Sequence, residues 1–208
     1  KDMTQTPRGL LRVVSGPAGS GKGTVVAELR RLLPDAALSV SATTRAPRPG
    51  EVDGVHYFFM SRDDFEDALG RGDILEHTVY CGNYYGTPKA EAERILASGH
   101  DLILEIETEG AMQIKRLYPD SVTVMLIPPD ARTLEARLRG RGTETDDVIR
   151  ARLARARDEI AKSDRYDYVV VNGQDQVSAC AAEIASILLA ERRRSARMRH
   201  VTDHFFDC

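Results

Sequence analysis

Leu10–Thr24 reads LLRVVSGPAGSGKGT, and the fold class follows from this segment. Its first five residues are apolar except for Arg12, which is typical of a short buried strand. Three glycines then lead to Lys22 with the spacing of a P-loop, in which backbone amides surround phosphate oxygens. Helical spacing follows directly, so the positive end of a helix dipole would face the bound anion. This order of strand, loop and helix favours a P-loop over a chance glycine-rich turn.

Strands and helices alternate along the rest of the chain. Short apolar runs predict strands at 101–107, 121–127 and 168–171, and helical spacing predicts helices at 111–117 and 177–190. A helix after Ser61 is also expected, because a serine hydroxyl can cap it. Alternation of this kind indicates a parallel sheet covered by helices on both faces. We therefore expect an α/β protein with a three-layer core.

Composition narrows the class of protein further. With 208 residues, of which 42% are hydrophobic, the chain can form a packed core. A net charge of −3 does not favour a nucleic-acid partner. No apolar run approaches the ~18 residues of a membrane span, so we expect no membrane partner. Three widely spaced cysteines favour a reducing compartment and a cytoplasmic location; a homo-oligomer is left open.

Two polar segments suggest how a phosphorylated substrate would be held. Residues 43–51, TTRAPRPGE, place Arg45 and Arg48 in a stretch that prolines make rigid. Two guanidinium groups held in this way can bind one phosphate dianion, although a solvated basic loop is the alternative. Residues 82–87, GNYYGT, set tyrosine hydroxyls between glycines. The alternative there is a β-turn with partly buried tyrosines.

Two carboxylates end the strand predicted at 101–107. Glu105 and Glu107 are two residues apart, so both side chains should lie on one face of the strand. There they would organise Mg²⁺ with its waters or contact the acceptor, and a pair of solvated acids is the alternative. Gly23 stands where a P-loop usually has a hydroxyl. We therefore expect no direct metal ligand, with Thr24 and Glu105 acting through water.

Four motifs in this order resemble the guanylate kinase family: the P-loop, residues 43–51, residues 82–87, and GRGTET at 140–145. The resemblance covers roughly Arg12 to Ala190. It implies an enzyme that moves a phosphoryl group from ATP, bound with Mg²⁺, to GMP or dGMP. The implied parts are a P-loop core at 8–39, 90–131 and 163–190, a GMP-binding insertion at 40–89, a helical lid at 132–162, and a basic and aromatic tail at 191–208.

The same resemblance implies roles for single residues. ATP would be bound by Gly16, Pro17, Ala18, Gly19, Ser20, Gly21, Lys22, Gly23, Thr24 and Asn172. GMP would be bound by Ser41, Arg45, Arg48, Glu51, Tyr57, Glu76, Tyr85, Thr87 and Glu107. Catalysis would depend on Lys22, Arg45, Arg137, Arg141 and Arg152, since phosphoryl transfer needs alignment and positive charge around the moving group. A carboxylate such as Glu76 can accept hydrogen bonds from guanine N1 and N2, which adenine does not offer.

Two rival functions remain. The first is a non-catalytic guanylate-kinase-like module that binds a phosphorylated protein through the arginine pair, but Lys22, Arg137, Arg141 and the intact glycines oppose it. The second is a kinase of the same architecture that acts on another nucleoside monophosphate. The remaining arginines of this region are expected to lie on a solvated helix face: Arg139, Arg150, Arg155 and Arg157.

Overall fold

The central sheet is parallel throughout. The structure, a computed structural model, describes residues 8–140 and 145–203. Five strands pair in the order β2-β7-β1-β8-β9, and every pairing is parallel. The expected α/β class is therefore confirmed. The strands are β2 (Ala37–Leu38), β7 (Leu102–Glu105), β1 (Leu11–Ser15), β8 (Val122–Ile127) and β9 (Tyr168–Val171).

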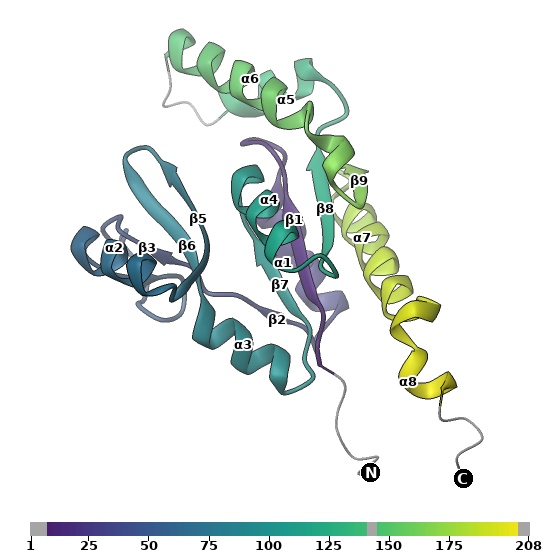
Figure 1. Cartoon of the computed structure of the whole chain (residues 1–208). Coiled ribbons are helices and arrows are strands. Elements are labelled where there is room, and N and C mark those ends of the chain that lie inside the picture. Colours follow the sequence, from purple (N-terminus) through teal and green to yellow (C-terminus); the bar gives the residue numbers. More distant parts are fainter. Residues whose placement is uncertain (1–7, 141–144, 204–208) are drawn as a thin grey trace.

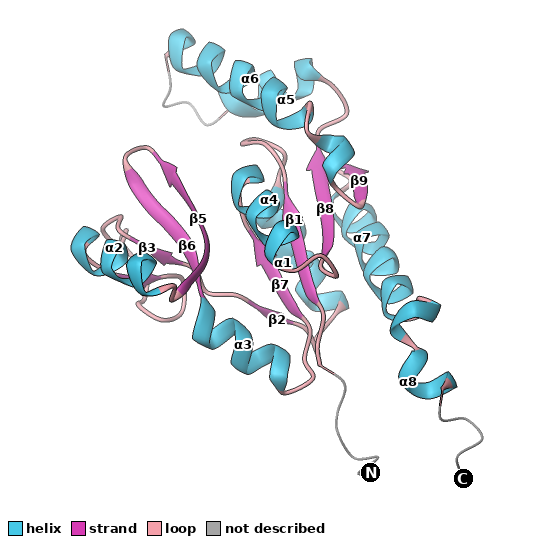
Figure 2. Ribbon diagram, in the orientation of Figure 1, coloured by secondary structure: helices cyan, strands magenta, loops and turns pink. Residues whose placement is uncertain are grey.

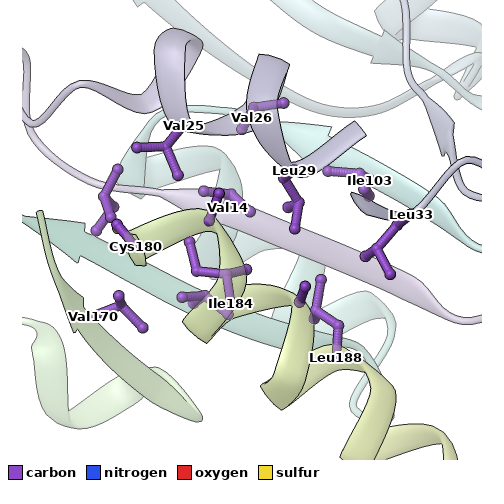
Figure 3. Close-up of a cluster of buried hydrophobic side chains, with 14 of the residues drawn as sticks. Val14, Val25, Val26, Leu29, Leu33, Ile103, Val170, Cys180, Ile184 and Leu188 are labelled. Carbon is purple, nitrogen blue, oxygen red and sulfur yellow. The ribbon is translucent and has the colours of Figure 1, made fainter. Parts of the chain in front are cut away.

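Alternate residues of β1 face opposite sides of the sheet, and helices cover both sides. Val14 packs in a buried cluster with α1 (Lys22–Leu32) and α7 (Val177–Arg192), as Figure 3 shows. Val13 packs in a second cluster, under α3 (Lys89–Ala97) and α4 (Thr108–Leu117). The three layers expected from the sequence are confirmed.

A second, four-stranded sheet stands beside the core (Figure 2). Its order is β4-β3-β6-β5, and α2 accompanies it. Ser61 caps α2 by accepting a hydrogen bond from the Asp64 amide, as expected. The β-turn alternative for the tyrosines of residues 82–87 is wrong, because both lie within β6. The elements are β3 (Ala42–Thr43), β4 (Phe58–Phe59), α2 (Arg62–Arg71), β5 (Ile74–Tyr80) and β6 (Asn83–Pro88).

Two helices form a separate layer beyond the end of β8, α5 (Ala131–Arg139) and α6 (Asp146–Ile160) (Figure 1). They pack on each other through Leu134, Leu138 and Ala156. A 3-10 turn follows α6, and α7 then runs to Arg192, two residues past the boundary expected at 190. Within the described residues no helix is long and apolar enough to cross a membrane. The short elements are η1 (Ser163–Arg165), η2 (Ser195–Arg197) and α8 (Arg199–Thr202).

Arg12, the polar interruption of β1, is buried in an ion pair. Its side chain is 2% exposed and pairs with Asp101, whose side chain is 5% exposed. Asp101 also accepts hydrogen bonds from the Leu10 amide at 2.8 Å and from Arg192 of α7 at 2.9 Å. Burial, together with the nearby positive charge of Arg192, lowers the pKa of Arg12 to about 10. One carboxylate therefore ties β1, the start of β7 and the end of α7 together.

We expect Asp101→Asn to destabilise the fold by about 3–5 kcal/mol, because it leaves the Arg12 charge buried without a counter-charge. Urea denaturation followed by circular dichroism measures this. Arg192→Gln is the control. It removes the Arg192 side chain, which is 47% exposed and pairs with Asp101. We expect it to lower the free energy of unfolding by under ~1 kcal/mol. Equal effects of the two substitutions would contradict this role for Asp101.

Candidate active site

The P-loop joins the end of β1 to the start of α1. Gly19 and Gly21 both have a φ of 89°, in the left-handed region that favours glycine. A Cβ at Gly16 would lie 2.0 Å from the carbonyl oxygen of Leu126 in β8. Side chains at these positions are thus excluded by conformation or by space, which fixes the loop at the edge of the sheet.

Asn172, directly after β9, supports this loop from behind. Its amide group donates to the Ser20 carbonyl at 2.8 Å, and the residue is 3% exposed. Arg137 of α5 donates to the carbonyls of Asn172 at 3.0 Å and Gly173 at 3.1 Å. Asn172 therefore holds the loop in place, and the ATP contact expected of it stays a prediction. Ala18 at the loop tip packs against the α5–α6 pair.

A pocket of about 320 Å³ lies between the P-loop, the end of β7 and the second sheet. This size is at the lower end of the range for small-molecule sites. Residues that the sequence placed in one site, although they are far apart along the chain, meet here. The expected site residues that line the pocket are Lys22, Ser41, Tyr57, Glu76, Tyr85, Glu105 and Glu107.

Lys22 and two carboxylates form the P-loop side of this pocket. The Lys22 ammonium donates to the Gly16 carbonyl at 2.5 Å and lies 3.5 Å from the Glu107 carboxylate. Burial raises the pKa of Glu105, and the charge of Lys22 opposes this rise. A Cβ at Gly23 would lie 3.5 Å from the Glu105 carboxylate, so this acid faces the P-loop. Both carboxylates line the pocket, although the strand expected to run to residue 107 ends at Glu105, and Glu107 directly precedes α4.

Arg45 is already held by an internal anion. Its guanidinium group donates to both Glu51 oxygens, at 2.9 and 3.0 Å, and lies 5.3 Å from the centre of the Tyr57 ring. This hydrogen bond holds the pKa of Glu51 at about 2. The Arg48 amide donates to Glu51 at 2.7 Å, while the Arg48 residue is exposed. Glu51 thus orients Arg45, and neither arginine is among the residues that line the pocket.

Glu76 is a buried carboxylate that lines the same pocket. It is 3% exposed and accepts a hydrogen bond from the Thr87 hydroxyl at 2.7 Å. Thr87 itself is fully buried, so its hydroxyl fixes one carboxylate oxygen. Burial raises the pKa of Glu76 to about 7. This group changes its charge near neutral pH.

The α5–α6 pair reaches the second sheet through cation–π contacts. The guanidinium carbons of Arg152 and Arg155 lie 5.9 and 5.6 Å from the centre of the Tyr80 ring. Arg155 also donates to Glu159 at 2.9 Å, and its side chain is 45% exposed, as expected for a solvated helix face. Arg139 and Arg150 form ion pairs that are largely exposed. Arg141 lies outside the described residues.

Half of the residues that line the pocket were not expected as site residues: Leu38, Ser39, His56, Thr78, Tyr80, Gly86 and Ile106. In α4, Gly110 lies against Glu76. Gln113 forms two hydrogen bonds with the backbone of His77, the next residue of β5. Gly110 was overlooked because it precedes the helix predicted at 111–117, where a glycine is an ordinary loop residue. Nothing in the pattern marked Tyr80 or Gln113, since their partners are distant in sequence.

Comparisons with known proteins agree with this site. Residues 9–191 match the family described as guanylate kinase. A guanylate kinase of Desulfitobacterium hafniense is 48% identical, over 93% of this chain and 96% of that protein. One of Streptococcus thermophilus is 50% identical, over 92% and 91%. A crystal structure of guanylate kinase from Anaplasma phagocytophilum superposes with a TM-score of 0.75 at 32% identity, over 92% of this chain and 90% of that one. The chain therefore belongs to the guanylate kinase family.

Proposed function

We propose that this chain transfers the terminal phosphoryl group of ATP to GMP, forming ADP and GDP. The observation that carries the proposal is that the P-loop lysine, Lys22, and the buried carboxylate of Glu76 line the same pocket. A phosphate-binding group and a group suited to guanine thus face one small cavity. The names of the relatives support the same reaction.

The acceptor base is recognised by Glu76. When ionised, its carboxylate accepts hydrogen bonds from N1 and N2 of guanine, and Thr87 holds it in place. Adenine presents no donor at N1, so AMP would leave this buried acceptor without partners, and such sites discriminate by about 10⁴ or more. Ser41 lines the same pocket and adds a hydroxyl. The expected residues contact the base and the phosphate, and none is expected to contact the ribose. Because dGMP differs from GMP only in the sugar, we include dGMP as an acceptor.

The phosphate of GMP is bound where Tyr57 and Tyr85 line the pocket, next to Arg45. Arg45, Tyr57 and Tyr85 lie together, with the two tyrosine rings 6.0 Å apart. Glu51 keeps Arg45 in a fixed direction, which reduces the ordering cost when the dianion arrives. The exposed Arg48 then closes on the phosphate from the solvent side.

Transfer itself requires alignment and positive charge more than a strong base. Lys22 and the P-loop amides hold the ATP phosphates. The α5–α6 pair acts as the lid, and it brings Arg137 and Arg152, with Arg141, toward the developing negative charge. Closure of the lid over the second sheet also excludes water that would hydrolyse ATP.

Mg²⁺ would be held mainly by the ATP phosphates and by water. Glu105 fits this part, because its carboxylate faces the P-loop at Gly23 and hard cations prefer oxygen ligands. Thr24, exposed in the first turn of α1, offers a hydroxyl nearby. The bound cation would neutralise phosphate charge. Because both nucleotides are metabolites of the cell interior, we also propose a cytoplasmic location.

We expect ADP formation from ATP and Mg²⁺ to occur with GMP and dGMP but to be negligible with AMP, CMP and UMP. Lys22→Ala should lower turnover with GMP by about 10²–10³ or more, because it removes a charge that stabilises the transferring group. A coupled assay of ADP release measures both effects.

Absence of turnover with every acceptor, together with tight binding of GMP, would instead support the non-catalytic module. Turnover that prefers another monophosphate would support the rival kinase.

We expect the KM for GMP to depend on the ionisation of Glu76. Its pKa in the folded protein is about 7, above the usual range. Below pH 7 the neutral form predominates and offers one fewer acceptor, so the KM for GMP should rise about tenfold per pH unit as pH falls. Steady-state kinetics between pH 6 and 8.5 measure this.

Glu76→Gln is the matched control, because it keeps the shape and removes the titration. We expect a KM for GMP about 10–150-fold higher than the wild type near pH 8, with the KM for ATP unchanged. A Glu76→Gln protein that keeps the wild-type pH profile would show that another group titrates.

A further inference from the structure

Gly110 stands inside α4 without a conformational need for glycine. Its φ is not among the positive values, so alanine could adopt the same backbone conformation. Glycine in a helix is less favourable than alanine because it loses more backbone entropy on folding. The reason for a glycine here must therefore be the space around it.

The carboxylate of Glu76 fills that space. A Cβ at Gly110 would lie 2.1 Å from Oε2 of Glu76 and 3.0 Å from its Cδ. The first of these separations is far below any normal contact between carbon and oxygen. The backbone of α4 thus packs directly against the group that is expected to recognise the acceptor base.

Further contacts restrict where Glu76 can move. Its residue is 3% exposed, and its other carboxylate oxygen accepts the Thr87 hydroxyl hydrogen bond at 2.7 Å. A second glycine, Gly86, packs against the main chain of Glu76, because a Cβ at Gly86 would lie 2.7 Å from the Glu76 carbonyl oxygen. Glu76 is therefore enclosed between two glycines of neighbouring elements.

Helix α4 is also prevented from moving back. Gln113, one turn after Gly110, accepts a hydrogen bond from the His77 amide at 3.1 Å and donates to the His77 carbonyl at 2.8 Å. This side chain pairs with a peptide of β5 much as a neighbouring strand would. It holds α4 against β5 at the residue that follows Glu76.

We infer that Gly110, with Gln113 one turn later, is a positioning residue for Glu76 and so determines the choice of acceptor base. This inference rests on the proposed function and assigns to α4 a part in selecting a 6-oxopurine with N1–H and a 2-amino group. A methyl group at position 110 would displace the carboxylate or push α4 away from β5. Either displacement spoils the alignment with the two donors of guanine.

Gly110→Ala should raise the KM for GMP about tenfold or more, with the KM for ATP changed less than twofold, because only the acceptor side is disturbed. The ratio of kcat/KM for GMP to that for AMP should fall accordingly. Gly70→Ala is the matched control, since Gly70 also lies in a helix, α2, and a Cβ there would meet nothing within 4 Å. We expect this control to keep wild-type kinetics.

A thermal denaturation cycle tests the steric conflict apart from activity. Gly110→Ala should lower Tm in the wild-type background but leave it unchanged or raise it in a Glu76→Ala background, where the conflicting carboxylate is gone. Equal Tm changes in both backgrounds, or an unchanged KM for GMP in an active Gly110→Ala protein, would overturn the inference alone. A wild-type protein that phosphorylates no guanine nucleotide would overturn the proposed function and the inference with it.

Discussion

The parallel pairing of β7, β1, β8 and β9 brings their carboxyl ends to one edge of the sheet, and the site depends on this constraint. β1 leads into the P-loop, and β7 leads to Glu105 and Glu107. β8 presents the carbonyl that crowds Gly16, and β9 leads to Asn172, whose amide holds Ser20. Each strand thus contributes one part of the phosphate-binding region, so an error in register at any of them would displace the loop.

The positive charges of the proposed site are held by internal partners, and in the proposed reaction the substrate phosphates would replace them. Lys22 and Arg45 pair with the carboxylates of Glu107 and Glu51. Arg137 donates hydrogen bonds to carbonyl groups behind the P-loop. These contacts keep long side chains ordered. They also lower the entropic cost of binding, because few rotamers remain to be fixed. Glu76 is the opposite case, an acid whose charged form is disfavoured by burial until a partner with two donors arrives.

The sequence predicted the core well and the second sheet poorly, for a physical reason. Buried parallel strands are continuous apolar runs, so β8 and β9 were located within one residue. The β5–β6 hairpin was missed because its strands carry His77, Tyr84 and other polar residues, without the alternation of a half-buried strand. Half of the residues that line the pocket were expected as site residues, chiefly through the family resemblance. Gln113 was missed because its role is set by a contact between elements 36 residues apart.

The central claim is that an ionised Glu76 binds the guanine of the acceptor. The most direct test is the number of protons released when GMP binds at pH 6.5, measured by calorimetry in buffers of different ionisation enthalpy. With a pKa of about 7 in the free protein, Glu76 is mostly protonated at this pH and must ionise on binding. We expect the wild type to release over half a proton more than Glu76→Gln. Equal release by the two proteins would contradict it.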